Sequence, residues 1–363
     1  MTHLFDPYKL KSVTLRNRIA VSPMCQYMAV NGVANEWHRV HYASLARGGA
    51  GLVVLEATAV APEGRITWGD LGLWNDAQAE ALRPIVAGIV EAGAVPGIQI
   101  AHAGRKASAN RPWEGDDHIP AGQPNSWTTV APSRLAFGGG LDRVPEELSL
   151  DDIKRLQAET VATVTRARDL GFQWLELHMA HGYLAQNFFS PISNHRSDTY
   201  GGSAENRARY LLETLVAVRK VWPADRPLTV RLGVVEFDGN DAMLGEAIAL
   251  LRRMKDEGLD FVDVSIGFNT PDAKIPWAPN FMGDIAAEVR RETGLPGTTS
   301  WYISKPDEAD ALVRDGKVDL VMLGRPLLAD PHWPYAAAKA LGLDNAAWAT
   351  LPAPYAHWLA RYR

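Results

Sequence analysis

The segment LHMAHGYLAQNF, residues 177–188, places two histidines and a tyrosine directly after a strand-like run. His178 and His181 are three residues apart, and Tyr183 follows two residues later. None of these groups helps a strand to pack, so their spacing indicates a site. Imidazoles hold a substrate oxygen by hydrogen bonds, and a phenol, protonated at neutral pH, serves as a general acid. The segment therefore predicts oxygen binding coupled to proton delivery.

The three side chains converge only if the strand ends near His178. A strand that continued would aim His181 at the opposite face, whereas a helical turn brings positions three apart together. Gly182 favours such a turn. A zinc ion is one alternative occupant, but zinc needs three or four ligands and no convincing third ligand accompanies the pair, so no metal is predicted. A purely structural role for the histidines is the other alternative.

Apolar runs that alternate with amphipathic ones define the surrounding fold. Eight strand-like segments are expected at 18–24, 51–60, 95–104, 172–180, 228–234, 261–267, 296–302 and 319–325. Helical patterns separate them, including 203–222 and 150–171, which has Ser149 as its cap and closes on Gly171. This alternation predicts an α/β fold, a (β/α)8 TIM barrel, with its active site at the carboxyl ends of the strands.

A single domain is expected over residues 1–363, because no internal linker or second domain is visible. The one long unpatterned stretch, 105–148, follows the third strand and is expected to cap the site. An open doubly wound sheet is the rival fold, but no strand leads into a G-x-G-x-x-G motif. The RGGAG stretch at 47–51 precedes a strand, so it is predicted to end a helix.

Polar residues also stand at the ends of other predicted strands. Gln99 and Arg231 lie in two of these strands, and Gly324 and Arg325 end the last one in LGRPLLADP. TIM barrels commonly bind phosphate at the loops after the last two strands, through backbone N–H groups. Gly324 allows a close approach there, and Arg325 adds a fork of donors. Together the four residues predict a phosphorylated heteroaromatic cofactor.

Composition bounds the partners and the compartment. The formal net charge of −5 gives no broad cationic field for nucleic acid or an anionic membrane. No apolar run approaches the ~20 residues that span a bilayer, and the start lacks the apolar core of a secretory signal, so a cytoplasmic protein is expected. The single cysteine, Cys25, excludes an internal disulfide and any four-cysteine cluster.

Several long motifs resemble those of a known family. SPMCQY, HAGRKAS, ELHMAHGYLAQNFFSPISNHRSDTYGG, ENRARYLLE and LGRPLLADP resemble the flavin-dependent ene-reductases of the Old Yellow Enzyme family, nearly end to end. Cys25 within PMCQY and the stretch HAGRKASANRPWEG resemble its thermophilic-like branch, most closely the xenobiotic-reductase type. The resemblance implies tight, non-covalent FMN, NADPH or NADH as reductant, and small α,β-unsaturated substrates such as enones and nitroalkenes. It also implies a ping-pong cycle, in which flavin N5 gives hydride to the substrate.

The resemblance also implies a role for each matching position. The positions expected to contact the flavin are Pro23, Met24, Cys25, Ala57, Gln99, Arg231, Ser300, Trp301, Gly324 and Arg325. The positions expected to form the substrate pocket are Tyr27, Ile66, His178, His181, Tyr183, Trp301 and Trp358. In this scheme the two histidines polarise the substrate oxygen, Tyr183 protonates the substrate carbon, and Cys25 tunes the flavin rather than attacking as a nucleophile. Tyr302 and Lys305, within SWYISKP, depart from the small residues common in related sequences.

The C-terminal segment 351–363, LPAPYAHWLARYR, is rich in aromatic and basic residues. By the same resemblance, chains pair as homodimers and this segment reaches the neighbour's active site, where Trp358 helps to close the pocket. The alternative is that Trp358 packs against the helices of its own barrel.

Three rival functions remain open at this point. An FMN-dependent hydroxy-acid oxidase would share the barrel, but it would need a histidine base and paired arginines for a carboxylate. A metal aldolase would lack flavin. A non-catalytic flavin-binding protein would hold the cofactor without turnover.

Overall fold

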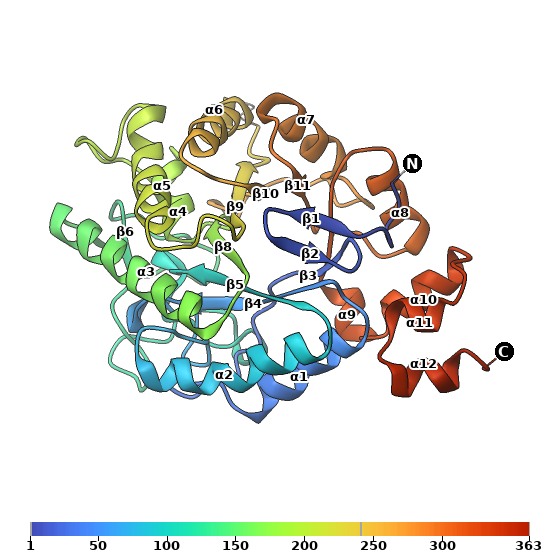
Figure 1. The fold of residues 1–363 in the computed structure, drawn as a ribbon. Helices are drawn as coiled ribbons and strands as arrows, with labels where there is room; N and C mark the ends of the chain where they lie inside the picture. Colours follow the sequence, from blue (N-terminus) through green and yellow to red (C-terminus); the bar gives the residue numbers. More distant parts are fainter. Residues whose placement is uncertain (1, 240–241, 363) are drawn as a thin grey trace.

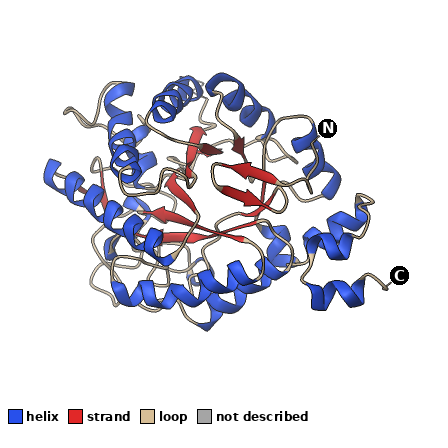
Figure 2. Ribbon diagram, viewed as in Figure 1, coloured by secondary structure: helices blue, strands red, loops and turns tan. Residues whose placement is uncertain are grey.

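The computed structural model describes residues 2–239 and 242–362, and within them eight parallel strands form a barrel, as Figures 1 and 2 show. Asp319 closes the ring, because its backbone N–H donates to the carbonyl oxygen of Gly297 across the last pair of strands (2.8 Å). In barrel order the strands are β11 (Gly297–Thr298), β10 (Phe261–Ile266), β9 (Leu228–Val235), β8 (Trp174–Met179), β5 (Val95–Ala101), β4 (Leu52–Ala59), β3 (Ile19–Val21) and β12 (Val321–Leu323). The predicted (β/α)8 barrel is confirmed, and each predicted strand segment coincides with one of these strands, with β9 running one residue past its predicted end.

Helices surround the strands on the outside of the barrel (Figure 2). The longer ones are α1 (Glu36–Arg47), α2 (Asp76–Glu91), α3 (Leu150–Leu170), α5 (Ala204–Arg219), α6 (Ala242–Asp256), α7 (Gly283–Thr293), α8 (Pro306–Arg314) and α10 (Trp333–Ala340). Short ones are α4 (Leu184–Phe189), α9 (Arg325–Ala329), α11 (Ala346–Thr350) and α12 (Ala353–Leu359). Among the described residues, no helix has both the length and the apolar character that a membrane span requires.

The predicted helix ends are confirmed in two places. Ser149 caps α3 by accepting a hydrogen bond from the backbone N–H of Asp152, and Gly171 ends the helix with φ 94°, where a side chain would be strained. Helix α1 ends at Arg47, and the glycines that follow it lead into β4. The RGGAG stretch is therefore a helix stop, as predicted.

In the part of the chain that the structure describes, two short strand pairs lie outside the barrel. The hairpin of β1 (Tyr8–Leu10) and β2 (Val13–Leu15) packs on the first residues of several barrel strands, where Trp174 and Phe261 meet edge to face with ring centroids 5.3 Å apart. It closes the amino-terminal end of the barrel, so only the opposite end remains for a ligand. The second pair, β6 (Val130–Ala131) and β7 (Glu146–Glu147), lies within the long excursion after β5.

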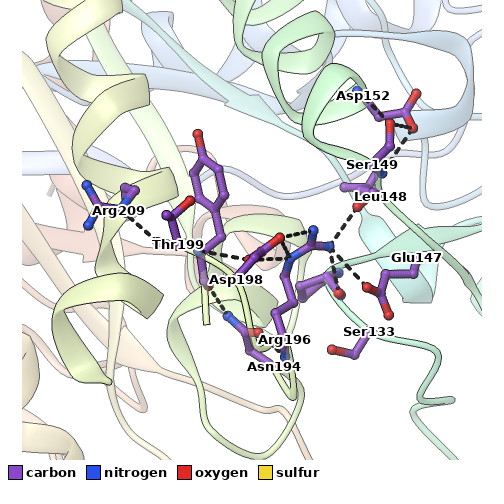
Figure 3. Close-up of polar contacts among 12 residues, drawn as sticks. Ser133, Glu147, Leu148, Ser149, Asp152, Asn194, Arg196, Asp198, Thr199 and Arg209 are labelled. Carbon is purple, nitrogen blue, oxygen red and sulfur yellow. Dashed lines mark hydrogen bonds and ion pairs between the residues drawn. The ribbon is translucent and has the colours of Figure 1, made fainter. Parts of the chain in front are cut away.

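Arg196 fastens that excursion, residues 105–148, to the loop between α4 and α5 (Figure 3). Its buried guanidinium donates to the carbonyl oxygens of Pro132 (3.0 Å) and Leu148 (2.6 Å) and pairs with Asp198 (2.6 Å). Charged donors on backbone acceptors are among the stronger hydrogen bonds in proteins. The excursion is therefore tied to the segment that follows the histidine cluster.

All of the barrel strands except β9 end earlier at their carboxyl ends than the sequence predicts. The expected strand 95–104 stops at Ala101, and the expected strand 296–302 pairs only at Gly297 and Thr298. Apolar runs continue past the last ladder bond, so periodicity alone does not reveal where pairing stops.

The C-terminal segment forms α12 beside α10 and α11 (Figure 1). Trp358 on this helix is 70% exposed, so the alternative that it packs against its own barrel is wrong. Arg363, the last residue of the segment, lies outside the described residues.

Candidate active site

A cavity of about 800 Å³ opens at the carboxyl ends of the strands. It is lined by Ser22, Pro23, Met24, His181, Arg231, Trp277, Pro279, Ser300, Trp301, Tyr302, Ile303, Ser304, Gly324, Arg325 and Pro326. Eight of the predicted site residues are among them: Pro23, Met24, His181, Arg231, Ser300, Trp301, Gly324 and Arg325. The lining, as far as the structure describes it, carries two arginines and no carboxylate, so it suits an anionic ligand of cofactor size.

The two histidines and the tyrosine converge beside this cavity. The ring centroids of His178 and His181 are 4.9 Å apart, and that of Tyr183 lies 5.0 Å from His178 and 6.3 Å from His181. All three pairs meet edge to face. The convergence predicted from their spacing is therefore confirmed.

A left-handed turn, not a helical one, brings the rings together. His181 and Gly182 have φ 63° and 69°, and a Cβ on Gly182 would collide with the carbonyl oxygen of Phe268. The ammonium of Lys106 bridges the turn to the next loop by donating to the carbonyl oxygens of His181 (2.8 Å) and Phe268 (2.9 Å). Such strain persists where surrounding contacts hold it, and it is concentrated at functional sites.

Hydrogen bonds assign which nitrogen of each histidine offers a proton. The backbone N–H of Ala180 donates to Nδ1 of His178 (3.3 Å), so Nε2 carries the proton. The buried hydroxyl of Ser265 lies 2.8 Å from Nε2 of His181 and accepts the indole N–H of Trp301 (3.1 Å). Because the indole only donates, the serine proton remains for Nε2, and we assign the proton of His181 to Nδ1.

Burial keeps these groups uncharged. Desolvation, then the charges of Arg231 and Lys106, hold the pKa of His178 well below its usual range, and the pKa of His181 is lowered in the same way. Desolvation also raises the pKa of Tyr183 well above its ordinary value. The cluster thus presents two neutral imidazole donors and a protonated phenol.

Neighbouring strands bring a charged layer beside the cluster. Arg231 pairs in register with His178 on β8 and with Asp263 on β10, and its Nε lies 3.0 Å from the carboxylate of Asp263. Gln99 on β5 donates its amide N–H to Glu176 (2.7 Å), which leaves its carbonyl oxygen as an acceptor for a heterocyclic N–H. Burial raises the pKa of Glu176 to about 8 and that of Asp263 to about 6.

A buried carboxyl group, that of Glu56, holds the turn that carries Cys25, and the sequence does not predict this role. Glu56 occupies a bulge in β4 and accepts the backbone N–H of Gln26 (2.7 Å) and the hydroxyl of Tyr42 (2.9 Å). Tyr27, next in the turn, has φ 54°. Burial raises the pKa of the Cys25 thiol, so this cysteine is not poised as a thiolate.

Other predicted positions are not among the lining residues of the cavity. Ala57 pairs in register with Gln99. Tyr27 contacts Trp113 edge to face at 6.0 Å between ring centroids. Ile66 and Trp358 are not among the lining residues of this chain.

Three positioning residues escape prediction from the sequence. Ser265 and Glu56 are polar residues inside apolar strand runs, and this break in the pattern is the only signal either one gives. Lys106 stands within the HAGRKAS motif, but its role as a bridge depends on loops far apart in the chain.

This architecture defines a class of protein: a TIM barrel whose carboxyl end holds a cavity with two arginines beside two neutral imidazoles and a phenol. The model of the NADH:flavin oxidoreductase / NADH oxidase family matches residues 3–344. The chain belongs to this family, and it is therefore a flavin-dependent enzyme that uses FMN with NADPH or NADH.

Relatives match over nearly the whole chain. NADPH dehydrogenase of Geobacillus sp. is 41% identical over 343 residues, which cover 94% of this chain and 95% of the relative. NADPH dehydrogenase of Listeria monocytogenes is 41% identical over 344 residues, which cover 94% and 96%.

Solved structures agree in fold. Morphinone reductase in complex with tetrahydroNAD has a TM-score of 0.79 at 26% identity, covering 95% of this chain and 92% of that one. The old yellow enzyme homologue from Zymomonas mobilis has a TM-score of 0.79 at 26% identity, covering 98% and 99%. The resemblance to the Old Yellow Enzyme family is confirmed.

Proposed function

We propose that this enzyme reduces C=C bonds activated by a neighbouring carbonyl or nitro group, with enones and nitroalkenes as its substrate class. The observation that carries the proposal is the neutral cluster of His178, His181 and Tyr183 beside the cavity. Two imidazole N–H groups suit one substrate oxygen, and a protonated phenol within the same cluster suits delivery of one proton.

The residues present fit FMN. Arg325 and the backbone at Gly324 would hold its phosphate, and Arg231 would face the edge of the ring where negative charge develops. Gln99 would accept the N–H of its pyrimidine ring. Pro23 and Met24 would line the opposite edge together with Cys25, and Ala57, Ser300 and Trp301 would complete the contacts. When bound, FMN supplies hydride exchange with NAD(P)H and with the substrate.

The chain's own groups would do the rest. Nε2–H of His178 and Nδ1–H of His181 donate to the substrate oxygen and stabilise the negative charge that develops there. Tyr183 transfers its phenolic proton to the α-carbon. Tyr27, Ile66 and Trp301 wall the pocket, and residues 105–148 exclude water from it.

We further propose that the enzyme works as a homodimer in the cytoplasm. Trp358 is 70% exposed in the single chain although it is a large aromatic residue, which supports burial against a second copy. Trp358 would then close the partner's pocket.

The test is an anaerobic spectral titration of the purified holoenzyme. NADPH should bleach the flavin band, and cyclohexenone should restore it with formation of cyclohexanone. A flavin that NADPH does not bleach would identify a binding protein without turnover. Bleaching by a 2-hydroxy acid in place of NADPH would favour the hydroxy-acid oxidase, and either result would contradict the proposal.

A further inference from the structure

Two aromatic side chains at the mouth of the cavity have no role in the chemistry proposed above. Trp277 is 52% exposed and Tyr302 is 47% exposed, yet both line the same cavity as His181 and Arg231. We call Trp277 and Tyr302 the aromatic shelf. Large aromatic residues left open beside a ligand cavity are unusual on a soluble protein and mark contact surfaces.

A continuous series of ring contacts joins the shelf to the oxygen-binding histidine. The ring centroid of Trp301 lies 5.8 Å from His181 and 5.9 Å from Trp277, and Trp277 lies 5.5 Å from Tyr302. A ligand whose oxygen sits at His181 therefore meets aromatic surface without a break as it extends outward.

The shelf is preformed rather than loose. Phe281 packs beneath both members, with ring centroids 5.8 Å from Trp277 and 6.5 Å from Tyr302. The backbone of Tyr302 is held in a left-handed conformation, φ 54°, and its carbonyl oxygen accepts the N–H of Asn280 (3.3 Å). A preformed aromatic surface binds a flat ring without the entropy loss of ordering side chains.

The described lining residues at this end carry no charge. Beside the shelf it consists of Pro279, Ile303 and Ser304, whereas the charged lining groups of the cavity are Arg231 and Arg325, both assigned above to FMN. A pyrophosphate or a second phosphate would need cations of its own. The shelf therefore suits an uncharged planar group better than the adenylate half of a dinucleotide.

We propose that the aromatic shelf binds the second, uncharged ring of aryl-substituted or fused-ring acceptors, while the oxygen of the activating group on the first ring binds the two histidines. The inference rests on the proposed function, because it assumes that the substrate oxygen lies at His178 and His181. The inference predicts that this enzyme binds bulky aromatic acceptors more tightly than small ones.

The test compares two para-substituted phenols in charge-transfer titrations of the oxidised holoenzyme: 4-methylphenol, with one ring, and 4-phenylphenol, with two. In Trp277→Leu and in Tyr302→Leu the dissociation constant for 4-phenylphenol should rise about five- to tenfold, the usual effect of one aromatic contact, and that for 4-methylphenol less than about twofold. Trp277→Phe, which keeps a ring, should restore most of the affinity. Trp348→Leu is the matched control, because Trp348 on α11 is also 52% exposed and lies outside the cavity lining.

Other results would overturn the inference. If the dissociation constants of both phenols rose equally in the variants, or if neither rose, the shelf would not bind the second ring. Weaker binding of NADPH in Trp277→Leu with unchanged 4-phenylphenol would assign the shelf to adenine instead. If neither phenol gave a charge-transfer band in the unmodified enzyme, the histidines would not bind a ligand oxygen. That result would contradict the proposed function itself, and it differs from every result that contradicts the shelf alone. FMN content and melting temperature of each variant exclude misfolding.

Discussion

The hydroxyl oxygen of Ser265 lies 2.8 Å from Nε2 of His181, and the same oxygen receives the indole N–H of Trp301 at 3.1 Å. Ser265, on β10, thereby fixes which ring nitrogen of His181, just after β8, carries the proton. Second partners of this kind orient functional imidazoles, and their loss reduces activity even though they touch no substrate.

Ser265→Ala should therefore weaken binding of phenol ligands and slow enone reduction, each by about three- to tenfold, the worth of one buried hydrogen bond. The flavin reduction rate with NADPH should stay near that of the unmodified enzyme. Ser265→Thr, which keeps the hydroxyl, should recover most of the loss. Equal phenol affinity in Ser265→Ala and the unmodified enzyme would contradict the assigned tautomer.

Tyr183→Phe should slow reoxidation of the reduced enzyme by a weakly activated enone by roughly 10²–10⁴-fold, the usual contribution of general acid catalysis. Flavin reduction by NADPH needs no proton from this phenol, so its rate should barely change. Stopped-flow traces of the two half-reactions separate these effects. If both half-reactions slow alike, Tyr183 is not the proton donor.

Glu56 should make stability fall as pH rises. Burial raises its folded-state pKa from 4.5 to about 8, so its contribution is fully present below pH 4.5 and is lost as pH rises toward 8. In Glu56→Gln this loss is absent, and the free energy of unfolding should decline less between those limits. Urea unfolding at several pH values measures it, with Glu36→Gln, an exposed first-turn acid of α1, as the control. Parallel pH curves for Glu56→Gln and the unmodified protein would refute the prediction.

Arg196→Met should destabilise the fold by about 3 kcal/mol, because it leaves backbone carbonyls and Asp198 without their cation in a largely buried place. Arg209→Met is the matched control in the same region (Figure 3), since the Nε–H of Arg209 donates to the carbonyl oxygen of Thr199 (2.7 Å) from a half-buried position. That control should cost about 1 kcal/mol or less. If the two variants lost similar free energies of unfolding in chemical denaturation, Arg196 would not hold residues 105–148 to the loop after α4.

The sequence predicts the barrel well, because eight apolar runs separated by amphipathic helices allow few other folds. The strand ends at Ala101 and Thr298 are not predictable in the same way, since apolar residues continue where backbone pairing stops.

The histidine cluster is visible in the sequence because its members are neighbours along the chain. Ser265, Glu56 and Lys106 are not visible in this way, because each acts on a segment far from it in sequence. The left-handed turn at His181 is also hidden, since a helical turn explains the same spacing and only Gly182 hints at the strain.

The position of deuterium in the product of cyclohexenone reduction shows directly whether this enzyme reduces the C=C bond. With NADPH carrying deuterium at its transferable position, in ordinary water, we expect label at the β-carbon of cyclohexanone. With unlabelled NADPH in D₂O, we expect label at the α-carbon, and Tyr183→Phe should give the same pattern at a much lower rate. Label from NADPH at the carbonyl carbon, or no label from NADPH in the product, would contradict reduction of the C=C bond by this enzyme.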